Sequence, residues 1–241
     1  MADVTEEGVP TLLAVAHGTR RPAGPETVRA LLDRVRALRP WLRVAESYGE
    51  LAEPVLETAL HRIDGPVVAV PLLLARGYHA LVDFPGRVER WCPDAVTARP
   101  LGPHALLAAA MSDRVADRLD VRDADAVVLG AAGSSDPAGL ADVRAAARLL
   151  SRRLRRPVPW GLVAADGPPL AEVVAEQRRR GARRVAVASY VLAPGMFHER
   201  MKACGADVVA EPIGAHDALA RLVLRRFDEA RLSAAVAVPV A

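Results

Sequence analysis

The chain carries the same order of strand-like and helix-like segments twice, and this repeat is what most constrains its fold. Residues 17–24, His-Gly-Thr-Arg-Arg-Pro-Ala-Gly, align with residues 132–139, Ala-Gly-Ser-Ser-Asp-Pro-Ala-Gly. Residues 68–70 and 185–187 are both Val-Ala-Val. Because a repeat at a fixed spacing indicates one structural unit copied along the chain, the sequence predicts two similar halves. We place them at residues 1–121 and 122–241.

Within each half, short apolar runs alternate with amphipathic segments. Residues 11–16 and 67–73 are nearly continuous apolar runs, which are typical of strands buried on both faces of a parallel sheet. Residues 25–38 repeat apolar side chains at helical spacing. This alternation predicts an α/β fold in which each half is a parallel sheet flanked by helices.

The composition excludes several classes of protein. With 241 residues, 51% of them hydrophobic, the chain can bury a sizeable core, and its net charge of only +3 argues against a nucleic-acid-binding protein. No apolar run approaches the ~20 residues that a membrane helix needs, and the acidic N-terminus lacks the features of a secretory signal. Cys92 and Cys204 follow no metal-ligand spacing, so we expect reduced packing residues in a cytoplasmic protein.

Three expected strands of the first half are each followed by a residue that can bind a metal. These residues are His17, Glu50 and His79. The carboxyl ends of parallel strands meet at one edge of the sheet, so the three side chains are expected to lie close together. Imidazole and carboxylate groups bind first-row divalent metals, and three protein ligands leave coordination positions open. The pattern predicts a metal site in the first half.

Each of these residues also has a structural interpretation when it is taken alone. A histidine at a strand end is often a hydrogen-bonded structural residue, and Glu50 could cap a helix that begins near residue 52. Asp83 could favour a helix dipole or support His79 through a hydrogen bond. In the second half Ala132 replaces His17. His198 is one residue out of register with His79 and could be a ligand, a proton relay or a surface residue, of which the surface residue is favoured. The second half is therefore expected to be a scaffold or lid.

Three motifs in this order resemble the sirohydrochlorin chelatase family, the ATP-independent class II chelatases, in their long form with two halves. The motifs are AHGTRRP at residues 16–22, YGELAEP at residues 48–54 and LLLARGYHALVDFP at residues 72–85. The sequence departs from the family pattern at Thr19, where serine is usual, at Gly49 before the glutamate, and at Phe84, where isoleucine is usual. None of these changes removes an expected ligand.

The resemblance implies a chelatase-like internal duplication and a lyase that inserts Co²⁺ or Fe²⁺ into sirohydrochlorin, in cobalamin or siroheme biosynthesis. Ni²⁺ is a further candidate for the metal, which is a substrate, and no nucleotide is required. His17 and His79 would be metal ligands, and Glu50 would be a third ligand or a base. Arginine pairs well with carboxylates, so Arg20, Arg21 and Arg76 could bind those of the tetrapyrrole, although ordinary surface charge also explains them. Both a monomer and a homodimer are compatible with the sequence.

Two other functions are also compatible with these residues. A strand followed by His-Gly-Thr-Arg is similar to the opening of histidine phosphatases, but Ala16 stands where their phosphate-binding arginine precedes the histidine. A metal or tetrapyrrole carrier without catalytic activity could use the same ligands, and only turnover distinguishes it from an enzyme.

Overall fold

The computed structural model describes residues 8–120, 124–164 and 166–237, and these residues form two compact units. Unit 1 holds residues 8–73, 78–101 and 220–237 of the described chain, and unit 2 holds residues 74–77 and the described residues from 102 to 219. Each unit contains one four-stranded sheet whose paired strands all run parallel. The predicted α/β fold is confirmed.

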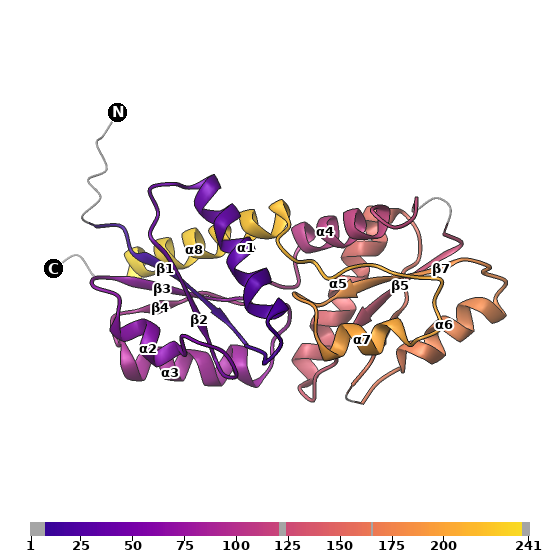
Figure 1. Cartoon of the computed structure of the whole chain (residues 1–241), viewed down its shortest axis with the longest axis horizontal. Coiled ribbons are helices and arrows are strands. Elements are labelled where there is room, and N and C mark those ends of the chain that lie inside the picture. Colours follow the sequence, from indigo (N-terminus) through magenta and orange to yellow (C-terminus); the bar gives the residue numbers. More distant parts are fainter. Residues whose placement is uncertain (1–7, 121–123, 165, 238–241) are drawn as a thin grey trace. The chain divides into compact units, whose positions relative to one another are not determined.

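The sheet of unit 1 has the strand order β2-β1-β3-β4. Its strands are β1 (Thr11–Ala16), β2 (Val44–Tyr48), β3 (Val67–Pro71) and β4 (Val96–Thr97). Its helices are α1 (Ala23–Leu38), α2 (Leu56–His61), the π-helical turn η2 (His79–Asp83), α3 (Phe84–Trp91) and most of α8 (Asp217–Ala237). In Figure 1, α2 and α3 lie below this sheet, while α1 and α8 lie above it. Apolar side chains of β1, β3, α2 and α3 form a buried cluster on the lower face.

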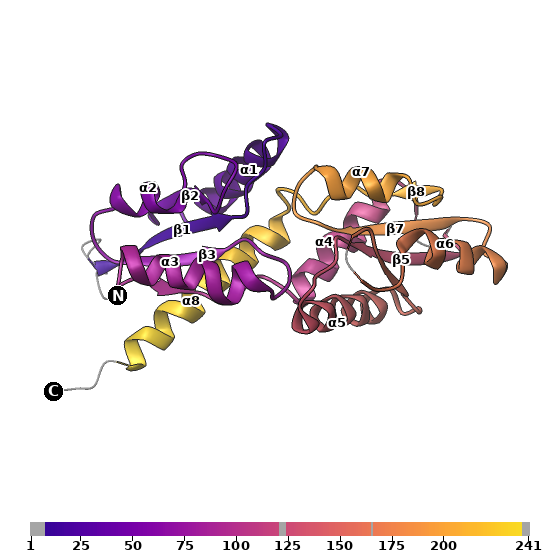
Figure 2. The same ribbon diagram turned by 90° about the horizontal axis from the view of Figure 1, so that it is seen from below.

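Unit 2 repeats this arrangement with the strand order β6-β5-β7-β8. Its strands are β5 (Ala126–Ala131), β6 (Trp160–Leu162), β7 (Val185–Tyr190) and β8 (Val208–Val209). Its helices are α4 (Ala105–Ala116), α5 (Pro137–Leu154), α6 (Leu170–Arg179) and α7 (Met196–Lys202). Figure 2 shows the same elements from below. The corresponding strand orders show that the sequence repeat is also a structural repeat.

The compact units do not coincide with the halves 1–121 and 122–241, because two helices are exchanged between them. Helix α4 belongs to the first half of the sequence but packs on α5 and β7 of unit 2. Helix α8 packs in unit 1 from residue 220, where Arg226 donates from Nε to the Pro100 carbonyl and from Nη2 to the Leu101 carbonyl, both at 2.8 Å. Thus α4, from the first half of the sequence, packs in unit 2, and most of α8, from the second half, packs in unit 1. The position of the repeat boundary near residue 121 stays a prediction.

The segment after β3 differs from the continuous helix that residues 80–91 predict. It begins as the π-helical turn η2, in which the Phe84 N–H donates to the His79 carbonyl five residues earlier, and continues as α3. Pro85 explains the difference. Proline lacks the N–H for an α-helical bond, and its ring crowds the carbonyl four residues back, so the widened turn accommodates it.

Two further expectations can be compared with the structure. Cys92 and Cys204 are free thiols, with Cys204 buried, as the sequence predicts. His198 is 1% exposed, so the expectation that it lies at the surface is wrong; its Nε2 is 3.1 Å from the Ala210 carbonyl. None of the helices in the described ranges is long and apolar enough to cross a membrane.

Candidate metal centre

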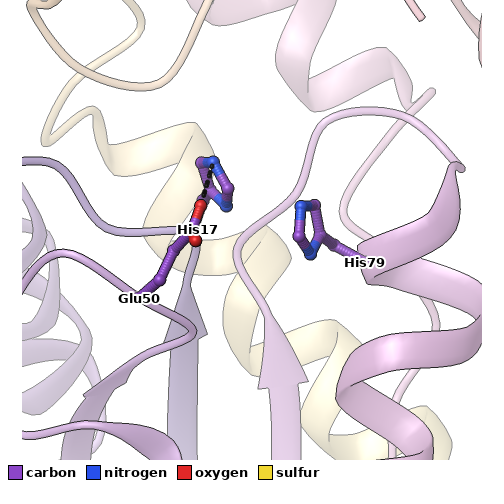
Figure 3. A group of neighbouring side chains, drawn as sticks. All are labelled: His17, Glu50 and His79. Atoms are coloured by element: carbon purple, nitrogen blue, oxygen red, sulfur yellow. Dashed lines mark ion pairs between the residues drawn. The ribbon is translucent and has the colours of Figure 1, made fainter. Parts of the chain in front are cut away.

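The three predicted ligands come from the point in the unit 1 sheet where the strand order reverses. The chain leaves β1 toward β2 on one side, and β3 pairs on the other side of β1. His17 directly follows β1, and His79 begins the turn after β3. In open parallel sheets, ligands bind in the crevice beyond the carboxyl ends of the strands at such a reversal. Figure 3 shows His17 and His79 beyond the ends of their two strands.

Backbone hydrogen bonds carry Glu50 to the same place. Tyr48 pairs with Ala16 at the end of the β1–β2 ladder. Beyond it, the Gly49 N–H donates to the Ala16 carbonyl at 2.8 Å, and the Glu50 N–H donates to the His17 carbonyl at 3.0 Å. The loop that bears Glu50 is therefore fixed to the loop that bears His17. Helix α2 begins only at Leu56 with Val55 as its N-cap, so Glu50 does not cap it.

Gly18 makes this close approach possible. Its φ is +99°, and a Cβ built on it overlaps the Glu50 carbonyl oxygen. Both features disfavour a side chain here: residues other than glycine rarely adopt this φ, and a Cβ would overlap the Glu50 carbonyl. The close contact between the His17 loop and the Glu50 loop therefore requires the glycine after His17.

We expect Gly18→Ala to lower the free energy of unfolding by on the order of 2 kcal/mol, because of backbone strain and overlap with the Glu50 carbonyl. Chemical denaturation followed by circular dichroism measures this change. Gly86→Ala is the matched control, since a Cβ there meets nothing within 4 Å and the residue lies in helix α3. The control should be neutral or slightly stabilising. A Gly18→Ala protein as stable as the control would contradict the assigned role.

The three side chains converge closely enough to share one ion. One ligand atom from each of His17, Glu50 and His79 lies within 4.8 Å of the others, and they form the one such group of three in the described part of the chain. His17 Nε2 is 3.3 Å from Glu50 Oε1, the pair joined by the dashed line in Figure 3, and the two imidazole ring centres are 4.7 Å apart. Donor atoms on a tetrahedral ion at about 2.1 Å lie roughly 3.4 Å apart, so the donor set fits a small divalent metal after a modest closure.

His79 is oriented by a second carboxylate. Its Nδ1 lies 2.9 Å from Asp83 Oδ2, four residues further along η2. A histidine that ligates a metal commonly donates its other ring N–H to a carboxylate, which fixes the tautomer and directs the free nitrogen to the ion. This contact matches the second of the two roles that the sequence suggests for Asp83. His79 also lies against the buried Phe84 ring, at 5.7 Å between ring centres.

The environment of His17 favours the neutral imidazole. Partial burial lowers its pKa from 6.5, and the nearby His79 lowers it further, whereas Glu50 and Asp83 act in the opposite direction. Its side chain is still 45% exposed, so the site is open to solvent. A neutral imidazole can bind a metal without first losing a proton.

We expect an NMR titration of His17 to give a pKa below 6.5 in the metal-free protein. Protons compete with a metal for His17 only below that pKa, so metal binding should persist to a lower pH than an unperturbed histidine allows. Glu50→Gln removes a charge that raises this pKa and should lower it further. A titration of His17 above 6.5 in the wild-type protein would contradict this description.

The three arginines expected to bind substrate carboxylates differ in their surroundings. Arg20 and Arg21 are exposed in the loop after His17, and neither has an ion-pair partner among the described residues. Arg76 donates from Nε and Nη2 to the carboxylate of the buried Asp142 in unit 2, with Nη2 2.8 Å from Oδ1. This ion pair raises the pKa of Arg76. Because Nε and Nη2 of Arg76 already pair with Asp142, the structure weakens the expectation that Arg76 binds a substrate carboxylate.

Two residues near the site, Arg87 and Glu57, were not predicted from the sequence; Arg87 contacts both Glu57 and the Gly49 carbonyl. The signal for Arg87 is present in the sequence, because His79, Asp83 and Arg87 follow one another at intervals of four residues. Residues at this spacing share one face of a helix.

The fold and the site together define a class: a duplicated α/β protein in which two histidines and one carboxylate converge at the edge of the first sheet, as a group that could hold a metal ion. The chain belongs to the CbiX family, whose family model matches residues 11–118 and again residues 126–230. The two matches correspond to the two copies of the repeat.

Named relatives agree with this assignment. The sirohydrochlorin ferrochelatase of Priestia megaterium is 25% identical over 231 residues, which cover 88% of this chain and 87% of that protein. The sirohydrochlorin cobaltochelatase of Methanosarcina acetivorans is 30% identical over 124 residues, 45% of this chain and 95% of that protein, so it corresponds to one half.

Among solved structures, SirB from Bacillus subtilis with Fe³⁺ superposes with a TM-score of 0.80 at 25% identity, covering 95% of this chain and 98% of that one. A complex of the SirB chelatase with cobalt has a TM-score of 0.73 at 25% identity, covering 92% and 95% of the two chains. The likeness extends over both units.

Proposed function

We propose that this protein is a sirohydrochlorin chelatase, which inserts Co²⁺ or Fe²⁺ into sirohydrochlorin for cobalamin or siroheme biosynthesis. The convergence of His17, Glu50 and His79 at one sheet edge carries the proposal, because these are ligands for a divalent metal with positions left open. Membership of the CbiX family and the activities named for its relatives support the same reaction. The metal is a substrate, and no nucleotide takes part.

The reaction exchanges two protons for one metal ion. The ion enters the macrocycle as two pyrrole N–H groups lose their protons, so the enzyme must release the ion and provide a route for protons. The two imidazoles present the ion on side chains that are nearly half exposed. The open positions of the metal let pyrrole nitrogens bind before the protein ligands leave.

Glu50 is the group best placed to accept these protons. Its side chain is 51% exposed and its Oε1 lies 3.3 Å from His17 Nε2. A carboxylate held at the metal site can ligate the entering ion and take a proton as the macrocycle binds it. Arg20 and Arg21, exposed three and four residues after His17, are proposed to pair with carboxylates at the rim of the tetrapyrrole.

We propose that the protein acts in the cytoplasm. Two cysteines that remain free thiols are compatible with action in the reducing cytoplasm. We propose a monomer or a homodimer. Unit 2 repeats the fold of unit 1 within one chain, whereas the Methanosarcina acetivorans relative corresponds to one half of it.

An anaerobic absorbance time course with sirohydrochlorin and Co²⁺, with and without the protein, tests the function. We expect the protein to accelerate the change from the metal-free to the metallated spectrum, and parallel runs with Fe²⁺ and Ni²⁺ rank the metals. Stoichiometric binding without acceleration would instead identify a carrier. Chelator-resistant phosphatase activity lost in His17→Ala would indicate the hydrolase, which neither the family match nor the relatives favour.

A further inference from the structure

Arg87 contacts two segments that position side chains of the candidate metal centre, but it is not itself one of the three candidate ligands. It lies in the first turn of α3, one turn after Asp83, and its side chain is 24% exposed. Its Nη1 donates to the Gly49 carbonyl at 2.9 Å and lies 3.7 Å from Asp83 Oδ2. Gly49 directly precedes Glu50, and the same Asp83 oxygen is 2.9 Å from His79 Nδ1. One guanidinium nitrogen therefore connects the Glu50 loop with the carboxylate that orients His79.

A third element holds this guanidinium in place. Arg87 Nε and Nη2 each lie 2.7 Å from a different carboxylate oxygen of Glu57, in the first turn of α2. The paired geometry fixes the plane of the guanidinium more firmly than a single hydrogen bond does. The contact raises the pKa of Arg87 and lowers that of Glu57, so both groups stay charged. Nη1 is thereby aimed between Gly49 and Asp83.

The backbone at Gly49 also packs against Phe84. A Cβ at Gly49 would lie 2.5 Å from Cε1 of Phe84, so the loop packs directly on the ring that follows η2. Phe84 packing and the Arg87 hydrogen bond therefore hold the Glu50 loop against the η2–α3 segment. On its other side, the same loop is tied to His17 by the backbone bonds described above.

We propose that Arg87 is a positioning residue, which sets the spacing between Glu50 and His79 and thereby the affinity and geometry of the metal site. This inference rests on the proposed function, in which His17, Glu50 and His79 hold the incoming metal. Partners that orient metal ligands typically change metal affinity 10- to 100-fold when they are removed, although they never touch the ion. Arg87 differs from such partners in supporting two ligands from different loops at once.

The test is a Co²⁺ titration of the full-length protein, followed by visible d–d absorption, with wild type, Arg87→Gln, Arg87→Lys and Arg90→Gln. Arg90 is the matched control, because it lies on the same helix, is exposed, and contacts the Trp91 ring. We expect Arg87→Gln to weaken Co²⁺ binding by at least about 10-fold and to change the d–d spectrum. The KM for sirohydrochlorin should remain within about twofold of wild type, because Arg20 and Arg21, which we propose to bind its carboxylates, are unchanged.

Arg87→Lys separates positioning from charge. Lysine keeps the positive charge but lacks the planar fork needed to contact Glu57 and Gly49 together, so it should also bind Co²⁺ more weakly than wild type. Circular dichroism and thermal melting establish that each variant is folded. Wild-type affinity and spectrum in folded Arg87→Gln, or full recovery in Arg87→Lys, would overturn the proposal.

Failure of the proposed function gives a different result. A wild-type protein that binds Co²⁺ but does not metallate sirohydrochlorin would contradict the chelatase activity, whereas the difference in Co²⁺ affinity between wild type and Arg87→Gln would still support the positioning role.

Discussion

His17→Ala is expected to reduce the rate of Co²⁺ insertion into sirohydrochlorin by at least about 100-fold, since even the partners of metal ligands contribute 10- to 100-fold. His17 follows β1 at the point where the strand order reverses, and its Nε2 lies 3.3 Å from Glu50. Alanine removes the nitrogen that we propose as a metal ligand and leaves two of the three candidate donors. The loss should appear both in Co²⁺ affinity, measured by direct titration, and in the initial rate of the absorbance change.

The fold should survive this substitution, because the imidazole is 45% exposed and the core of unit 1 does not depend on it. His61→Ala is the control: His61 is an exposed histidine of α2 whose ring contacts Trp91. Near wild-type insertion by a folded His17→Ala protein would contradict the role of His17 as a metal ligand. An equal loss in His61→Ala would show that the loss is not specific to the candidate site.

Glu50→Gln is expected to have the second largest effect and to act mainly on turnover. Glutamine keeps the size of the side chain and one oxygen donor but cannot accept a proton at neutral pH. General bases typically contribute 10²- to 10⁴-fold, so we expect kcat to fall by about 100-fold or more. Co²⁺ affinity should fall less than in His17→Ala, because both imidazoles remain. Steady-state insertion kinetics at saturating Co²⁺ separate the two effects.

Glu53→Gln is the matched control, since Glu53 is an exposed carboxylate three residues away whose Oε2 accepts the Val55 N–H. It should retain wild-type kinetics. If Glu50→Gln lowers affinity but leaves kcat intact at saturating metal, Glu50 is a ligand only, and the base must be another group.

The sequence predicted the parts of the fold that follow from local pattern. The buried runs of β1 and β3 could only be central strands, and a turn with glycine after β1 placed His17 at the sheet edge. Because parallel strands end at the same edge of a sheet, the sequence alone groups His17, Glu50 and His79. The structure brings these three side chains together, and their roles as ligands and base stay a prediction for the experiments above.

Other features depend on packing that no local pattern records. The amphipathic faces of α4 and α8 show that each helix covers a sheet, but not which of two similar sheets, so the helix exchange was not predicted. Arg76 lies three residues before His79 in the sequence, yet it pairs with Asp142, 66 residues away. His198 carries a polar ring but is buried against the Ala210 carbonyl. Arg87 was missed because its partners Glu57 and Gly49 lie 30 and 38 residues away in the sequence, so only its spacing from Asp83 is visible there.

Anomalous diffraction at the cobalt absorption edge, from crystals grown with Co²⁺, tests the central claim most directly. We expect one strong peak bounded by His17, Glu50 and His79, at about 2.0–2.2 Å from an imidazole nitrogen of each histidine. His17→Ala crystals should lose or greatly weaken this peak. A cobalt peak held by other residues, with the three side chains unliganded, would contradict the account.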